Sequence, residues 1–158
     1  MHSEVDQLHT IGLLAAHEAA IADLYRLYAD KLPDRKEFFE GLADDEVDHA
    51  RQIVSFAGKV KAGSISVNPG RFSEETILAS LDYVREQIRE QGKTAFSPVE
   101  ALSTAAGIEN AMIEKRFFEI VEGDGPEIKQ LLRGLAAATA AHRARLLQEC
   151  EKEKEGEG

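Results

Sequence analysis

Apolar residues recur at alternating steps of three and four along four long segments of this 158-residue chain. That spacing puts them on one face of an α-helix, the face that packs against neighbouring helices in a bundle. The four prolines stand between these segments or at their first positions, where a helix begins or ends. The sequence therefore predicts an all-α protein, with helices over residues 3–29, 34–61, 74–90, 98–122 and 126–150.

Local signals mark where these helices begin. The stretch SPVE at residues 97–100 combines an N-cap serine, a proline at the first helical position and a glutamate three residues after the cap. Asp34 and Ser73 are the expected N-caps of the second and third helices. The stretch NPG at residues 68–70 predicts a turn within the connection that precedes the third helix.

The lengths of the connections predict how the helices pair. Short loops join the first helix to the second and the fourth to the fifth, which favours two antiparallel hairpins. The connection between the hairpins, residues 62–97, is long and carries the shorter helix. One long crossover between two hairpins is the connectivity of a ferritin-like four-helix bundle. We expect the bundle to occupy residues 1–150 and the charged residues 151–158 to form a flexible tail.

Charge and composition narrow the classes of partner. The formal net charge of −10 argues against a nucleic-acid partner, because phosphate binding requires a basic surface. No apolar run approaches the length of a membrane span and the first residues do not resemble a signal peptide, so we expect no membrane partner and a cytoplasmic location. The single cysteine, Cys150, excludes an internal disulfide and any metal site built from cysteines alone.

Polar side chains interrupt the apolar stripe near the middle of each long helix. Glu46 and His49 take consecutive core positions three residues apart, where they share one helical face and can hold one ion. Each of the other three long helices places a carboxylate or an imidazole in the same way. The inward-facing residues are Glu18, Glu46, His49, Glu109, Thr139 and His142.

Carboxylates that face the core require an opposite charge or hydrogen-bond donors nearby to offset the cost of their burial. An unpaired carboxylate in an apolar core costs several kcal/mol, and three of them close together would also repel one another. A divalent metal ion compensates best, and oxygen and imidazole donors without thiolate suit iron, manganese or zinc. The alternative is a polar core network without metal, in which Arg116, two turns after Glu109, pairs with the carboxylates.

These residues resemble the rubrerythrin branch of the ferritin-like superfamily, and the resemblance covers nearly the whole chain. Glu18, within AAHEAAI, is similar to the glutamate of the family's first helix. Glu46 and His49, within DEVDHA, are similar to the Glu-x-x-His of its second helix. Glu109, within GIEN, and His142 are similar to the glutamate and the histidine of the last two bundle helices.

The resemblance implies a metal site, most simply iron as a di-iron or single-metal centre, with those five residues as ligands. It implies a non-haem oxidoreductase, a peroxidase of the rubrerythrin type that reacts with peroxide or oxygen, in a homodimer. Tyr25, two turns after Glu18, would hydrogen-bond a ligand carboxylate. Because the chain lacks a Cys-x-x-Cys pair, electrons would come from a separate donor protein.

The sequence departs from the family at Thr139, which stands where the family has a glutamate that bridges two irons. Met112 likewise stands where rubrerythrins often carry an extra glutamate. These departures leave open a single metal, a second weakly held metal, or a bridge from solvent or an exogenous carboxylate. They also leave open iron handling without turnover, and a scaffold bundle that has lost efficient metal chemistry.

Several ionisable residues close to this set in sequence are expected to face solvent. His17 precedes Glu18 and lies off its core-facing stripe, so it is expected at the surface. The aspartates on either side of Glu46, which are Asp44, Asp45 and Asp48, are expected to be solvated charges on the outer face of the second helix.

Overall fold

The computed structural model describes residues 3–68, 74–111, 113–123 and 125–157, and almost all of them are helical. The prediction of an all-α protein is confirmed. None of the described helices is both long and apolar enough to cross a membrane. The elements, in chain order, are α1 Glu4–Lys31, the 3₁₀ turn η1 Pro33–Arg35, α2 Lys36–Lys61, β1 Ser66–Val67, α3 Glu74–Lys93, α4 Pro98–Asn110, α5 Ile113–Glu119, β2 Val121–Glu122 and α6 Pro126–Glu157.

One of the three expected N-caps, Ser97, begins its helix as predicted. The Ser97 hydroxyl accepts a hydrogen bond from the Glu100 N–H at 3.2 Å, and Pro98 is the first residue of α4, as predicted. Asp34 is not the N-cap of α2. It lies inside η1, and α2 begins at Lys36, because Pro33 sets a tight turn that must be completed before the helix can start. The predicted cap Ser73 lies outside the described residues.

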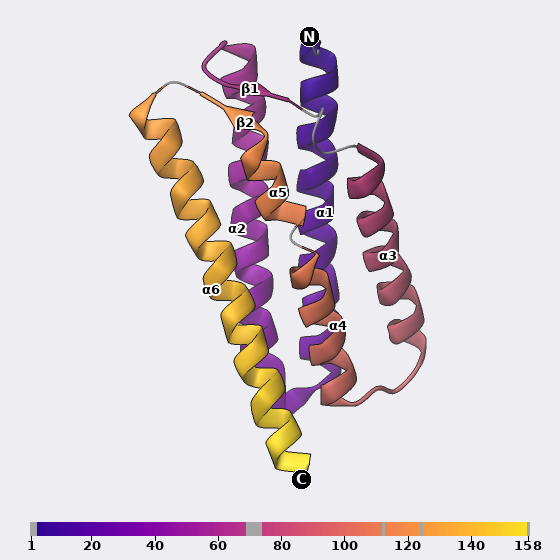
Figure 1. Ribbon diagram of the computed structural model, residues 1–158. Helices are drawn as coiled ribbons and strands as arrows, with labels where there is room; N and C mark the ends of the chain where they lie inside the picture. The colour runs from indigo at the N-terminus through magenta and orange to yellow at the C-terminus, as the bar shows by residue number, and fades with distance from the viewer. Residues whose placement is uncertain (1–2, 69–73, 112, 124, 158) are drawn as a thin grey trace.

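The helices run along one another in two groups (Figure 1). α1 and α2 are antiparallel neighbours joined at one end by η1. α3 follows the outer side of α1 in the same direction, since His9 contacts Glu74 near the start of both helices and Tyr28 contacts Gln91 near their ends. α4 and α5 then run back toward the other end of the molecule, and α6 returns beside them.

The prediction of a single helix over residues 98–122 is wrong. α4 ends at Asn110, α5 is a separate short helix, and β2 pairs antiparallel with β1 in the register Ser66↔Glu122 and Val67↔Val121. The apolar residues of this small sheet are buried with Ile65 and Ile120, so the connection after α2 gains both backbone partners and a core. Met112, at the break, lies outside the described residues.

Two glycines allow the chain to enter and leave the two-stranded sheet. A Cβ added to Gly123, just after β2, would lie 3.0 Å from Ile128 Cγ2 and 3.1 Å from Ile65 Cγ2, closer than a methyl group can approach without displacing them. Gly63, after the end of α2, has a φ of 77°, a left-handed conformation that glycine adopts without strain. Both glycines therefore help to turn the chain between a helix and the two-stranded sheet.

The last helix is longer than predicted. α6 continues to Glu157, through the residues expected to form a tail after Cys150. Glutamate and lysine are strong helix formers, and Lys152 pairs with Glu149 at 3.3 Å one turn earlier. Arg35 of η1 contacts the carboxylates of both Glu149 and Glu153, which ties this end of α6 to the turn between α1 and α2.

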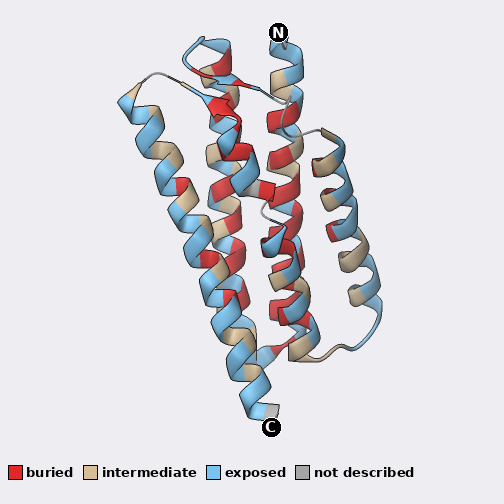
Figure 2. Ribbon diagram, in the orientation of Figure 1, coloured by how far each residue is buried: buried red, intermediate tan, exposed pale blue. Residues whose placement is uncertain are grey.

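Buried residues line the inner sides of the helices (Figure 2), and the apolar ones form two clusters. One contains Tyr25, Tyr28, Phe39 and Leu102, together with Leu32 next to η1. The other contains Ile11, Ile53, Phe56 and Phe117, together with Val67 and Val121 of the two-stranded sheet. Each long helix contributes residues to both clusters, so its middle lies between them.

Candidate metal centre

A layer of buried polar side chains lies between the two apolar clusters. In α1, Leu14 belongs to one cluster and Ala20 to the other, and Glu18 stands between them. The same order recurs in α2, in the α4–α5 pair and in α6. This buried polar layer consists of Glu18, Glu46, His49, Glu109 and His142, none more than 8% exposed. Five of the six residues expected to face the core are therefore buried, and the sixth, Thr139, is partly buried.

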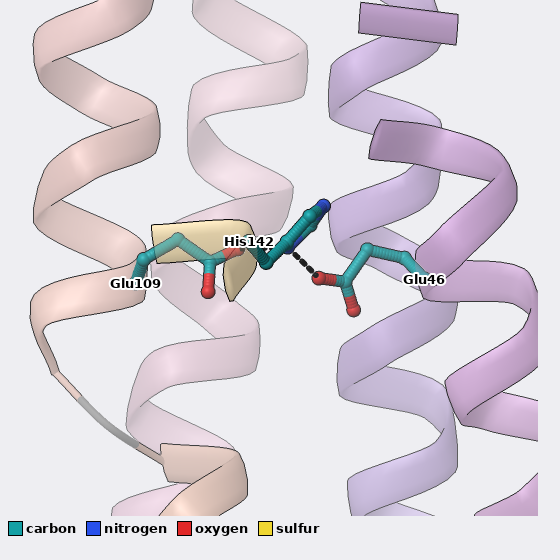
Figure 3. A group of neighbouring side chains, drawn as sticks. All are labelled: Glu46, Glu109 and His142. Carbon is teal, nitrogen blue, oxygen red and sulfur yellow. Dashed lines mark ion pairs between the residues drawn. The ribbon is translucent and has the colours of Figure 1, made fainter. Parts of the chain in front are cut away.

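Three helices bring donor atoms together at one point of this layer (Figure 3). Glu46 of α2, Glu109 of α4 and His142 of α6 each offer one ligand atom within 4.8 Å of the others. His142 Nδ1 is 3.1 Å from Glu46 Oε1 and 3.2 Å from Glu109 Oε1. Donors about 2.1 Å from a shared ion lie roughly 3–4 Å apart, so this spacing matches a mononuclear site.

Glu18 and His49 flank that group. The Glu18 carboxyl lies within hydrogen-bonding reach of Glu46, and His49 Nδ1 is 4.0 Å from Glu46 Oε2. Burial acts to raise the pKa of Glu18, but hydrogen bonds with Glu46 and His17 and the nearby imidazoles outweigh it and hold the pKa below its ordinary value. Glu18 is therefore held as an anion beside the carboxyl group of Glu46.

Tyr25 supplies the expected hydrogen bond to a carboxylate of the set. Its hydroxyl donates to Glu109 Oε1 at 2.8 Å, and its ring lies edge-on to that of His142, with 6.1 Å between ring centroids. Burial and the charges of Glu109, Glu46 and Glu18 raise the Tyr25 pKa well above its ordinary value. The phenol therefore stays protonated and keeps donating to Glu109 across the whole neutral range.

Thr139 does not contribute a donor of the same kind. Its hydroxyl donates to the Leu135 carbonyl at 3.0 Å, the usual local bond of a threonine within a helix. Together with Glu18, Glu109 and His17 it lines a cavity of about 10 Å³, close to the lower limit for one water molecule. The side chain therefore borders the layer and leaves a small space beside two of its carboxylates.

The prediction that His17 lies at the surface is wrong. His17 is 2% exposed, and its ring bridges Glu18 of α1 and Ser80 of α3. The periodicity of α1 alone could not reveal this, because α3 covers the side of α1 that would otherwise face solvent. The signal available in the sequence was the long crossover, whose helix had to pack on some face of the first hairpin.

Asp45 also lies closer to the site than predicted. Its side chain is 43% exposed and its Oδ2 is 3.8 Å from His142 Nε2 and 3.5 Å from an Arg145 guanidinium nitrogen. A carboxylate behind the outer nitrogen of a ligand histidine is a common arrangement in metal sites. Asp45 is thus a half-exposed neighbour of His142 rather than a fully solvated charge.

The described part of the core offers no lysine or arginine to the carboxylates of the layer. Within the described ranges, the buried ionisable residues are glutamates, histidines and tyrosines. Arg116, the cation of the metal-free alternative, is exposed. Neither ring nitrogen of His142 makes a hydrogen bond to the described residues, although the ring is 2% exposed. The residues present therefore fit a divalent cation, which would both balance the carboxylates and occupy a histidine nitrogen.

A groove opens toward the layer between α2 and α6. It has a volume of about 420 Å³, and His49 and Gln52 lie along its α2 side. Its α6 side carries the small residues Gly134 and Ala138, which leave room between the helices. His49 thus belongs both to the buried polar layer and to the lining of the groove.

Comparison with protein-family models, with curated proteins and with solved structures finds no match to this chain. The assignment of function therefore depends on the fold and on the chemistry of the buried polar layer.

Proposed function

We propose that this chain is a rubrerythrin-like, ferritin-like metalloprotein whose buried polar layer binds iron. In this proposal α1, α2, the α4–α5 pair and α6 are the four helices of the bundle, and α3 is the helix of the crossover. The order and direction of the helices support it, because two antiparallel hairpins are joined by a segment that runs the length of the molecule.

The observation that carries the proposal is the convergence of Glu46, Glu109 and His142 in a core that contains no buried lysine or arginine in its described part. Glu18 and His49 complete the proposed ligand set, since each lies beside Glu46. Carboxylate and imidazole donors favour iron, with manganese or zinc as the competing metals.

When bound, iron would supply redox chemistry toward peroxide or oxygen, with electrons from an external donor. Residues of the chain would exclude water from the metal site and orient its ligands. The two apolar clusters keep bulk water away from the layer, and Tyr25 holds the Glu109 carboxylate in one orientation through its 2.8 Å hydrogen bond. The groove beside His49 admits a reactant of small size.

Metal analysis of the purified protein and anaerobic titration with Fe(II) test binding. Glu46→Gln should abolish binding, because it removes the carboxylate that faces both His142 and His49. Glu40→Gln is the matched control, since Glu40 is an exposed glutamate of the same helix and should leave binding unchanged. Equal iron content in the wild type and the Glu46→Gln variant would refute the proposed site.

Peroxide added to the Fe(II) protein then tests reactivity. A rapid increase in ferric absorbance supports a peroxidase. Stable binding without that change would favour the second candidate, iron binding without turnover. The specific observation behind this candidate is Thr139, which places a hydroxyl where the resembling family has a bridging glutamate, and whose hydroxyl is engaged with its own helix.

A further inference from the structure

One buried histidine lies outside the proposed ligand set. His17 Nδ1 is 3.2 Å from Glu18 Oε1, and its Nε2 is 2.7 Å from Ser80 Oγ. The imidazole is 2% exposed and the Glu18 residue is 1% exposed. A buried polar ring is costly unless both nitrogens are satisfied, and here both are.

The hydrogen bonds define a direction. In the form that would bind metal, the Glu18 carboxylate can only accept, so His17 Nδ1, 3.2 Å from Glu18 Oε1, would carry the hydrogen and donate. In the neutral ring Nε2 then accepts from the Ser80 hydroxyl. The Glu18 carboxylate thereby selects the tautomer, and the Ser80 hydroxyl, which can donate or accept, fixes the orientation of the ring. The result is a chain of contacts from α3, which contributes nothing to the proposed ligand set, to a carboxylate of the buried polar layer.

We propose that His17, oriented by Ser80, is a positioning residue that holds the Glu18 carboxylate ready to bind metal. This inference rests on the proposed function. His17 does not act as a ligand itself, because both ring nitrogens are engaged with protein atoms. Glu18 is a long side chain with several rotamers, and the 3.2 Å bond to His17 restricts it to one of them. The crossover helix α3 thus takes part in building the site, through Ser80.

Cobalt(II) is the probe, because its visible absorption bands report the number and geometry of its ligands as well as its affinity. His17→Leu should weaken Co(II) binding by about ten- to hundredfold, the usual effect of removing a partner of a ligand, and should alter those bands. His17→Asn places an amide N–H near the position of Nδ1 and should recover part of both. Ser80→Ala should give a smaller loss than His17→Leu, since the imidazole remains.

His9→Leu is the matched control. His9 lies on the same helix and also contacts a residue of α3, Glu74 at 3.1 Å, but its side chain is 61% exposed and far in sequence from Glu18. Its loss should leave Co(II) affinity and spectrum unchanged. Thermal unfolding of the metal-free variants shows separately how much each substitution affects folding.

A graded loss of affinity with a changed spectrum supports the inference. Wild-type affinity and spectrum in the His17→Leu variant would overturn it, as would a loss of folding stability without any change in Co(II) binding. If His17→Leu does not fold, His17→Asn and Ser80→Ala decide, and wild-type binding in both overturns the inference. Failure of the wild-type protein itself to bind Co(II) would overturn the proposed function, and this inference with it.

Discussion

Carboxylates gather in two regions of this molecule, and they have different partners. Near the end of α6, Glu149 and Glu153 share one guanidinium, that of Arg35, and all three side chains are about one-fifth exposed. In the buried polar layer, three glutamates face imidazoles and a phenol. The first region resembles an ordinary structural ion pair, which needs nothing from outside the chain.

The contrast shows that the buried polar layer lacks a basic side chain among its described residues. Removing carboxylates from water is more costly in the core than at the partly exposed end of α6, yet among the described residues the arginine that is one-fifth exposed lies at the end of α6 and no arginine is buried in the core. A fold that needed the buried glutamates merely for cohesion would be served better by apolar side chains. The layer therefore suits an external cation, whereas the carboxylates near the end of α6 do not need one.

Metal removal should have the largest effect. A ligand present at a thousand times its dissociation constant stabilises the folded state by about 4 kcal/mol, which corresponds to roughly 10 °C in the unfolding midpoint of a chain of this size. Calorimetry of the iron-loaded protein, before and after treatment with a chelator, measures this shift. Identical midpoints would mean that the layer is not stabilised by metal.

Glu46→Gln should raise the stability of the metal-free protein and lower the stability of the protein in the presence of iron. It replaces a buried acid with an amide that can still donate a hydrogen bond to Glu18 and that needs no counter-charge, so we expect the metal-free protein to gain about 1–2 kcal/mol of stability. The same variant should gain nothing from added iron, because a ligand is missing. Denaturant unfolding with and without Fe(II) measures both quantities, and a loss of stability in the metal-free variant would contradict the idea that the buried acid is costly without metal.

Arg35→Met should behave differently. It leaves two carboxylates of α6 without their guanidinium while keeping the apolar part of the side chain, and we expect a loss of about 1 kcal/mol. The loss should be the same with and without metal, and iron affinity should not change. A metal-dependent loss would show that the two carboxylate regions are coupled.

Alkaline titration tests the phenol that borders the layer, with the smallest effect near neutral pH. Burial raises the pKa of Tyr25 well above 10.0, and it also raises the pKa of Tyr28. Because the folded pKa exceeds the unfolded one, this contribution to stability is complete below pH 10 and is lost as the pH rises further. In a Tyr83→Phe variant, which retains only these two tyrosines, tyrosinate absorbance should appear together with unfolding. Tyrosinate that appears while the helical signal is intact would contradict the burial argument.

Some of the fold and the site could be predicted because they depend on local periodicity. Ser97 and Pro98 start α4 through bonds made within one turn of helix. Glu18 and Glu46 interrupt an apolar stripe, and such a position is buried in any bundle that uses the stripe as its core. The expected hydrogen bond from Tyr25 formed with Glu109, and the sequence had not specified which carboxylate would accept it.

Other features depend on which segments meet. The break after Asn110 serves the pairing of β2 with β1, residues about 55 positions apart in sequence, whose partnership no local pattern encodes. His17 is buried because α3 covers it, and the choice of the helix face on which α3 packs is made by the packed structure. Asp45 approaches His142 for the same reason, since α2 and α6 meet only after folding.

The sequence by itself determined that the chain is helical, where most of its helices begin, and that five acids and imidazoles of the apolar stripes face inward, because helix periodicity and capping act over a few residues. Only the tertiary structure decided that Glu46, Glu109 and His142 converge within 4.8 Å and that His17 joins Glu18 to α3. Distances between helices depend on how side chains far apart in sequence fill a shared interior, and that packing is settled by the whole chain at once.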